Sequence, residues 1–179
     1  GVDAVFPGKG EDELYFVVPV SPSPSAAPSE DGSAGIALGL ALCRQLAESE
    51  PSLEVHVLFL GADFGGSPEY FRGSSAFLER FYSPGQSAFV YLHFPSLPER
   101  VTLLPASTKQ VSPYWLLDWT VSNLREANTL PFLNFIRFQL YRLGLNDEPS
   151  PIHPYLAKGY PAIYLTGETS ETASDREHS

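Results

Sequence analysis

The chain has a single cysteine, no methionine and no long apolar run. One cysteine excludes an intrachain disulfide, and the apolar helical run around Cys43 predicts a buried structural thiol. The longest uninterrupted apolar stretch, from Ala34 to Cys43, is far shorter than the roughly 20 residues that span a bilayer. No signal-peptide pattern is present either. We therefore expect any membrane attachment to come from segments outside this chain.

Basic residues are also scarce: 11 Lys and Arg stand against 21 Asp and Glu, giving a net charge of -10. This charge disfavours nucleic acid and anionic membrane surfaces as partners. Hydrophobic residues make up 43% of the 179 residues, which is enough for one domain with a sizeable core. We predict a single domain over residues 1–167 and a polar, disordered tail over residues 168–179.

Segments typical of strands and helices alternate along the chain. β-branched and aromatic runs predict strands over residues 2–6, 14–20, 53–63, 87–94, 100–106 and 160–167. Helical spacing predicts helices over residues 33–48, 74–81, 113–127, 131–144 and 154–159. Several predicted strands are apolar on both faces. The pattern therefore predicts an α/β fold, a three-layer α/β/α sandwich with a mostly parallel, mixed central sheet.

Helix-start residues and small residues refine this prediction. Asp31 or Ser33 is a suitable N-cap for the first helix, and that helix is rich enough in glycine and alanine to lie close to a sheet. Pro113 suits the first helical turn, and Pro131 is expected to open the next helix. In such folds, ligands bind at the carboxyl ends of the strands. The loops expected at this end are residues 21–32, 61–73, 93–100 and 146–153.

These loops carry recognisable short motifs. They read "DGSAGIA" from Asp31, "LFLGADFGG" around Asp63, "FVYLHF" ending beside His93, and "SPIHPYLAKGYPAIYL" around His153. In order and spacing, from Val2 to about Gly167, they resemble the M28 family of zinc aminopeptidases. This family includes glutaminyl cyclases and non-catalytic relatives. The resemblance implies a zinc-aminopeptidase-like fold.

The resemblance also implies where the family's metal ligands would fall. Asp31 takes the place of the Asp that bridges two zinc ions, and Asp63 takes that of the general base. Ser21 falls at the first His ligand, and Phe64 falls at a Glu ligand. His93 stands where the family has an Asp ligand.

The last ligand position falls on Ile152, with His153 one residue later. A dizinc site needs about five ligands and a base, and hydroxyl, phenyl and alkyl groups at Ser21, Phe64 and Ile152 are poor or impossible ligands. The resemblance therefore predicts a degenerate site with no catalytic residue, no metal and no other cofactor.

The predicted function is a non-catalytic M28-like domain with a binding or structural role and a protein or peptide partner. The resemblance favours an extracytoplasmic or lumenal part of a larger membrane protein or complex. One alternative is a residual zinc-dependent aminopeptidase or amidase, with one zinc on Asp31, His93 and His153 and with Asp63 as a further ligand or the general base. Another is a peptide-binding module that keeps the old cleft without chemistry.

Each candidate residue also has a structural interpretation. Asp31 can cap a helix, Asp63 can accept hydrogen bonds from loop amides beside Gly65 and Gly66, and His93 can be a satisfied cleft or core histidine. His153 precedes a proline and is expected in an exposed loop. His56 alternates with apolar neighbours in a strand and has no partner that the sequence identifies.

Overall fold

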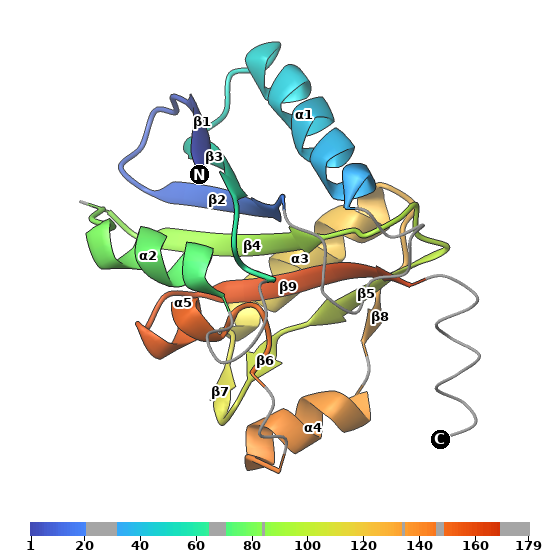
Figure 1. Cartoon of the computed structure of the whole chain (residues 1–179). Helices are drawn as coiled ribbons and strands as arrows, with labels where there is room; N and C mark the ends of the chain where they lie inside the picture. Colours follow the sequence, from blue (N-terminus) through green and yellow to red (C-terminus); the bar gives the residue numbers. More distant parts are fainter. Residues whose placement is uncertain (21–31, 65–70, 84, 134, 146–148, 169–179) are drawn as a thin grey trace.

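The structure, a computed structural model, describes residues 1–20, 32–64, 71–83, 85–133, 135–145 and 149–168. A seven-stranded sheet runs through the molecule (Figure 1). Its strands are β1 (Val2–Phe6), β2 (Glu13–Pro19), β3 (Glu54–Leu60), β4 (Ser87–His93), β5 (Arg100–Leu104), β8 (Phe132–Leu133) and β9 (Ala162–Glu168). Two short strands, β6 (Ala106–Ser107) and β7 (Gln110–Val111), form a separate pair. The helices are α1 (Ser33–Ala47), α2 (Arg72–Arg80), α3 (Tyr114–Glu126), α4 (Phe135–Leu143) and α5 (His153–Ala157).

The strand order is β1-β3-β2-β4-β9-β5-β8. Strands β3, β2, β4 and β9 pair in parallel, and so do β5 and β8. Strand β1 runs antiparallel to β3, and β5 runs antiparallel to β9. The predicted mixed, mostly parallel sheet is confirmed.

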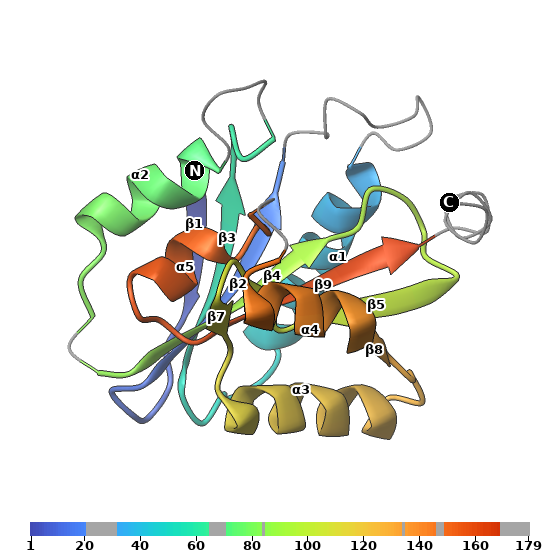
Figure 2. The ribbon, with the colours of Figure 1, turned by 90° about the horizontal axis from the view of Figure 1, so that it is seen from below.

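Helices cover both faces of the sheet, as the sequence predicted. On one face, Leu116 of α3 is part of a buried cluster against which Leu42 of α1 packs. On the other face, Leu78 of α2 and Tyr155 of α5 pack in a second cluster. The same arrangement can be followed in the two ribbon views (Figure 1 and Figure 2). Strand β4 runs between the two clusters and is buried over almost all of its length.

Glycine lets α1 approach the sheet closely. A Cβ at Gly39 would lie 2.8 Å from a carbon of the Phe59 ring, and one at Gly35 would lie 3.3 Å from the carbonyl oxygen of Phe94. No larger residue fits at Gly39 unless the ring moves. The prediction of a small-sided helix close to the sheet is confirmed.

Several predicted boundaries are wrong. The N-cap of α1 is Gly32 in a left-handed conformation, with no side-chain cap, so Ser33 does not cap this helix. Asp31 lies outside the described residues. Helix α3 begins one residue later than predicted, because Pro113 is its N-cap with an extended ψ of 144°.

Pro131 does not open a helix. The two residues after it form β8, whose Phe132 and Leu133 pair with Thr102 and Leu103 of β5. The Arg100 guanidinium also lies 4.2 Å from the centre of the Phe132 ring. Pairing with β5 therefore takes precedence over the helical pattern until Phe135.

The last strand, β9, continues to Glu168, one residue into the predicted tail. Residues 169–179 lie outside the described residues, so the prediction of a disordered tail stays a prediction.

Candidate functional site

Asp63 follows the end of β3 and is completely buried. One oxygen of its carboxylate accepts a hydrogen bond from the Ser74 amide at 2.7 Å. The other accepts hydrogen bonds from the Ser74 hydroxyl at 2.6 Å and from the Tyr91 hydroxyl at 2.8 Å. The Tyr155 hydroxyl in turn donates to the Ser74 hydroxyl at 2.9 Å. This network connects the end of β3 with α2, β4 and α5.

Burial raises the pKa of the Asp63 carboxyl, and the hydrogen bonds from Ser74 and Tyr91 partly oppose this rise. The partners differ from the expected ones: the donors come from α2 and β4. The sequence predicted that loop amides beside Gly65 and Gly66 donate hydrogen bonds to Asp63. These two glycines lie outside the described residues. A sequence reading could not identify Tyr91, because it is 28 residues away in another strand.

Glycine makes the Asp63 contact possible. A Cβ at Gly73 would lie 2.1 Å from the carbonyl oxygen of Gly61 and 2.9 Å from the Asp63 carboxylate. Only a residue without a side chain lets the start of α2 come this close to the end of β3.

His93 ends β4 and is mostly buried between aromatic rings. The ring of Phe64 stacks on its imidazole, with centroids 4.4 Å apart and planes inclined by 26°. Nδ1 of His93 is 3.0 Å from the Tyr164 hydroxyl of β9. Burial lowers the pKa of His93 to about 4, so the imidazole is neutral at pH 7. This agrees with the interpretation of His93 as a satisfied cleft or core histidine.

The two residues at the last predicted ligand position are placed differently from each other. Ile152 is fully buried beside Tyr155. His153 is partly buried and begins α5, so the prediction of an exposed loop residue is wrong. Its Nδ1 is buried and has no hydrogen-bond partner among the described residues.

The described part of the predicted site is only partly assembled. Phe64 and His93 are in contact, and Asp63 precedes Phe64 in the chain. Among the described residues, however, Asp63, His93 and His153 do not belong to any group of three ligand atoms within 4.8 Å of one another. Ser21 and Asp31 lie outside the described residues.

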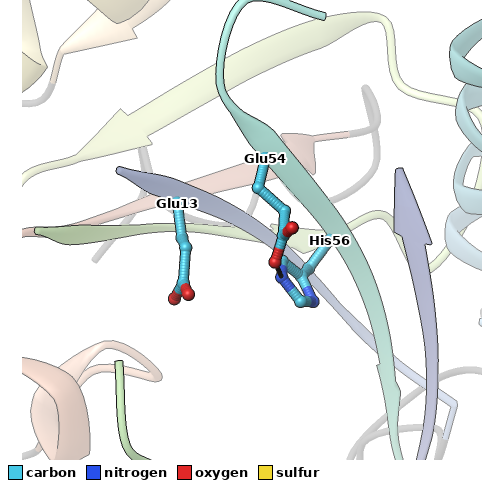
Figure 3. Close-up of side chains that lie close together, drawn as sticks. All are labelled: Glu13, Glu54 and His56. Carbon is cyan, nitrogen blue, oxygen red and sulfur yellow. Dashed lines mark hydrogen bonds and ion pairs between the residues drawn. The ribbon is translucent and has the colours of Figure 1, made fainter. Parts of the chain in front are cut away.

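A polar cluster that the sequence reading missed lies elsewhere on the sheet. Glu13, Glu54 and His56 each offer a ligand atom, and these atoms lie within 4.8 Å of one another. Figure 3 shows Glu54 against the imidazole, with the carboxylate of Glu13 to one side. Nδ1 of His56 is 3.0 Å from a carboxylate oxygen of Asp3, and Nε2 is 3.0 Å from one of Glu54. The expectation that His56 has no identifiable partner is therefore corrected.

Burial alone would lower the pKa of His56, but its hydrogen bonds and ion pairs with Asp3 and Glu54 outweigh burial and raise it. The ring also stacks on Tyr15 at 4.2 Å. A sequence signal did exist. Glu13 and Tyr15 alternate along one strand and Glu54 and His56 along the next, so each pair lies on one face.

A cleft of about 580 Å³ lies next to this cluster. Asp3 of β1, Tyr15 of β2, Leu58 of β3, and Phe77 and Arg80 of α2 are among its lining residues. The cleft therefore opens between α2 and the β1 side of the sheet.

Among the described residues, no helix is long and apolar enough to cross a membrane.

The family model described as TP_0564_1st family, first domain, matches residues 39–175. The chain belongs to the TP_0564_1st family. No curated protein matches the sequence of this TP_0564_1st domain.

The fold of this TP_0564_1st domain is similar to solved structures of zinc exopeptidases and glutaminyl cyclases. Bacteroides thetaiotaomicron glutaminyl cyclase bound to N-acetylhistamine has a TM-score of 0.63 at 13% identity, over 95% of this chain and 64% of that one. A Zn-dependent exopeptidase from Parabacteroides distasonis has a TM-score of 0.60 at 14% identity, over 96% and 65%. The Bacillus subtilis zinc aminopeptidase BSAP has a TM-score of 0.62 at 16% identity, over 95% and 40%.

At such identities the likeness shows the fold alone, and it confirms the predicted zinc-aminopeptidase-like α/β architecture. The TP_0564_1st domain spans less than two thirds of the length of these structures.

Proposed function

We propose that this domain is a non-catalytic relative of the zinc exopeptidases, with a binding or structural role in a larger protein or complex. The observation that carries the proposal is the stacking of Phe64 on His93 at 4.4 Å. In the M28 resemblance, Phe64 stands at a Glu ligand position, and a phenyl ring offers no lone pair to zinc. Here the ring covers a face of the imidazole at the next ligand position.

The surroundings of Asp63 support the same conclusion. A general base needs an oxygen that can take a proton from a bound water. The Asp63 carboxylate instead accepts hydrogen bonds from the Ser74 amide, the Ser74 hydroxyl and the Tyr91 hydroxyl. These are the contacts of a carboxylate that fixes a helix to a sheet.

The described ligand candidates fit a zinc pair poorly. Ile152 is buried in the apolar core, and His93 and His153 are not grouped with a third ligand among the described residues. We therefore derive no catalytic step through zinc for this domain.

A binding role is supported by the distribution of exposed apolar side chains. Most of the large apolar side chains that are exposed in the described part of the chain lie between Val111 and Leu145. They are Val111, Tyr114, Trp115, Trp119, Leu130, Phe132, Phe135, Ile136, Leu140, Leu143 and Leu145. Exposed tryptophan and phenylalanine are typical of protein interfaces. The description of the family model as a first domain supports placement in a larger protein.

The proposal is tested by assaying purified protein, prepared without chelator, for aminopeptidase and glutaminyl cyclase turnover. His93→Gln and Asp63→Asn are assayed beside the unmodified protein, each checked for folding by its melting temperature. We expect no turnover above background in any sample. Turnover that depends on added zinc and is lost in His93→Gln would overturn the proposal. The domain would then be a residual zinc aminopeptidase or amidase, with Asp31, His93 and His153 as the zinc ligands.

A further inference from the structure

We propose that Glu13, Glu54 and His56 form a binding site for one divalent transition-metal ion, with Asp3 as the carboxylate that orients the histidine. The site is independent of the proposed function, because it lies at the other end of the sheet. Glu13 and Glu54 are the first residues of β2 and β3, whereas Asp63 and His93 lie where β3 and β4 end. A seven-residue strand separates the two ends by about 20 Å.

The backbone brings the three ligand residues together. Strands β2 and β3 pair in parallel, with Glu13 directly opposite Glu54 and Tyr15 opposite His56. Residues two apart in a strand share a face, so His56 lies on the same face as both glutamates. The three ligand atoms lie within 4.8 Å of one another, and both glutamate side chains are partly exposed.

Two hydroxyl groups hold Glu13 in place. One of its oxygens, Oε2, accepts hydrogen bonds from the Tyr15 hydroxyl at 3.0 Å and the Ser87 hydroxyl at 3.2 Å. Both bonds go to the same oxygen, which leaves Oε1 for a ligand. The glutamate is therefore oriented by neighbours that are not themselves charged.

The charge of the cluster also favours a cation. Glu13 and Glu54 are like charges directly opposite each other, an arrangement that destabilises a sheet unless something lies between them. Asp3 adds a third carboxylate, and among the described residues His56 is the one basic group that ion-pairs with Asp3 and Glu54. A divalent ion offsets the remaining negative charge better than one imidazolium does.

The histidine is held as a metal-binding histidine commonly is. Nδ1 of His56 is directed at Asp3. Nε2 is directed at Glu54, as Figure 3 shows. A ligating histidine usually donates its other ring N–H to a carboxylate, which fixes the ring. An ion between Nε2 and the glutamates would take the place of the Nε2 proton. One imidazole and two carboxylates suit zinc, cobalt or manganese.

Three protein ligands leave one tetrahedral position for water or another small ligand. Asp3 and Tyr15, which contact His56, also line the adjacent cleft of about 580 Å³. The cleft therefore lies beside the proposed site, next to the two residues that hold His56.

The test uses the full chain stripped with chelator, desalted and titrated with CoCl2 and, separately, ZnCl2. Cobalt binding is followed by its visible absorption and zinc binding by calorimetry. We expect about one ion per chain, and at least tenfold weaker binding in Glu13→Gln and in Glu54→Gln. His56→Gln should abolish the cobalt spectrum. Glu50→Gln, at a glutamate whose side chain is 91% exposed, is the matched control and should bind as the unmodified protein does.

The other outcomes are also decisive. Absence of binding in the unmodified protein, or equal binding in Glu13→Gln and Glu50→Gln, overturns the metal site and leaves the proposed function untouched. Binding that survives Glu13→Gln but is lost in His93→Gln places the ion at the opposite end of the sheet and overturns the metal site proposed here, and the turnover assay then decides the proposed function. Because Glu13 is partly exposed, its variant is expected to fold even if His56→Gln does not, and the melting temperature without metal checks this.

Discussion

The phenyl ring of Phe64 stacks on the imidazole of His93, with centroids 4.4 Å apart and planes inclined by 26°. Phe64 follows the end of β3, and His93 is the last residue of β4. Strand β2 lies between these two strands in the sheet. Aromatic contacts of this kind are stabilising by about 0.5–1.5 kcal/mol beyond the area they bury. At two positions where the M28 resemblance places metal ligands, the domain thus has an apolar contact.

The first prediction concerns the pH dependence of stability. The pKa of His93 is lowered to about 4 in the folded state, from 6.5. A lowered pKa gives stability that is fully present above pH 6.5 and is lost as the pH falls towards 4. The loss is at most about 3 kcal/mol, from the difference between the two pKa values.

This is measured by urea unfolding at pH 7.5 and pH 4.5. The difference between the two pH values should be smaller in His93→Gln than in the unmodified protein. Titration of the His93 ring by NMR gives a direct check, and a midpoint near 6.5 would contradict the prediction.

The second prediction concerns the hydrogen bond from Tyr91 to Asp63. Tyr91→Phe removes one donor from a buried carboxylate, which costs about 1–3 kcal/mol because the desolvated oxygen gains no new partner. Chemical denaturation measures the loss. Tyr82→Phe, at an 85% exposed tyrosine, is the matched control and should change stability by less than about 0.5 kcal/mol. Equal effects in the two variants would show that the Tyr91 bond contributes nothing.

The third prediction concerns Gly73. A Cβ there would lie 2.1 Å from the Gly61 carbonyl oxygen, so Gly73→Ala must push α2 away from the end of β3. We expect a loss of about 1–3 kcal/mol in the free energy of unfolding. At Gly10 the nearest atom to an added Cβ is 3.9 Å away, so Gly10→Ala makes the same substitution without a clash and is the control. If both variants unfold at the same denaturant concentration, the close approach is not structurally important.

The fourth prediction concerns the exposed apolar side chains of α4. Phe135 and Ile136 are 62% and 75% exposed, so replacing both by serine should change the unfolding free energy by less than about 1 kcal/mol. The double variant should nevertheless bind less of a hydrophobic fluorescent dye, because the surface loses apolar area. Leu97→Ser, at an 86% exposed leucine in a different region, should leave dye binding nearly unchanged. Equal dye binding in all three proteins would contradict an apolar binding face at α4.

Much of the fold could be predicted because the signals are local. The apolar runs that became β2, β3 and β4 are long and β-branched, and the glycines of α1 indicated a close approach to the sheet. The error after Pro131 has a non-local cause, since Phe132 and Leu133 pair with β5, about thirty residues earlier. Helical spacing alone could not show that these residues would form a strand with β5 and not a helix.

The site was predictable only in part, for a related reason. The position of Asp63 at a strand end could be inferred from the sequence, but its donor Tyr91 depends on the packing of β3, α2 and β4. The His56 cluster depends on register. Asp3 reaches His56 only because β1 pairs with β3 antiparallel, and the two residues are 53 positions apart.

The contacts of Asp63 have a consequence for the segment between β3 and α2. The Phe71 amide donates to the Asp63 carbonyl oxygen at 3.1 Å, and the Ser74 amide donates to the Asp63 side chain at 2.7 Å. One residue therefore ties the end of β3 to the start of α2 twice, once through its backbone and once through its side chain. A substitution of Asp63 would remove only the second tie, because the bond from the Phe71 amide goes to a carbonyl oxygen that every residue has.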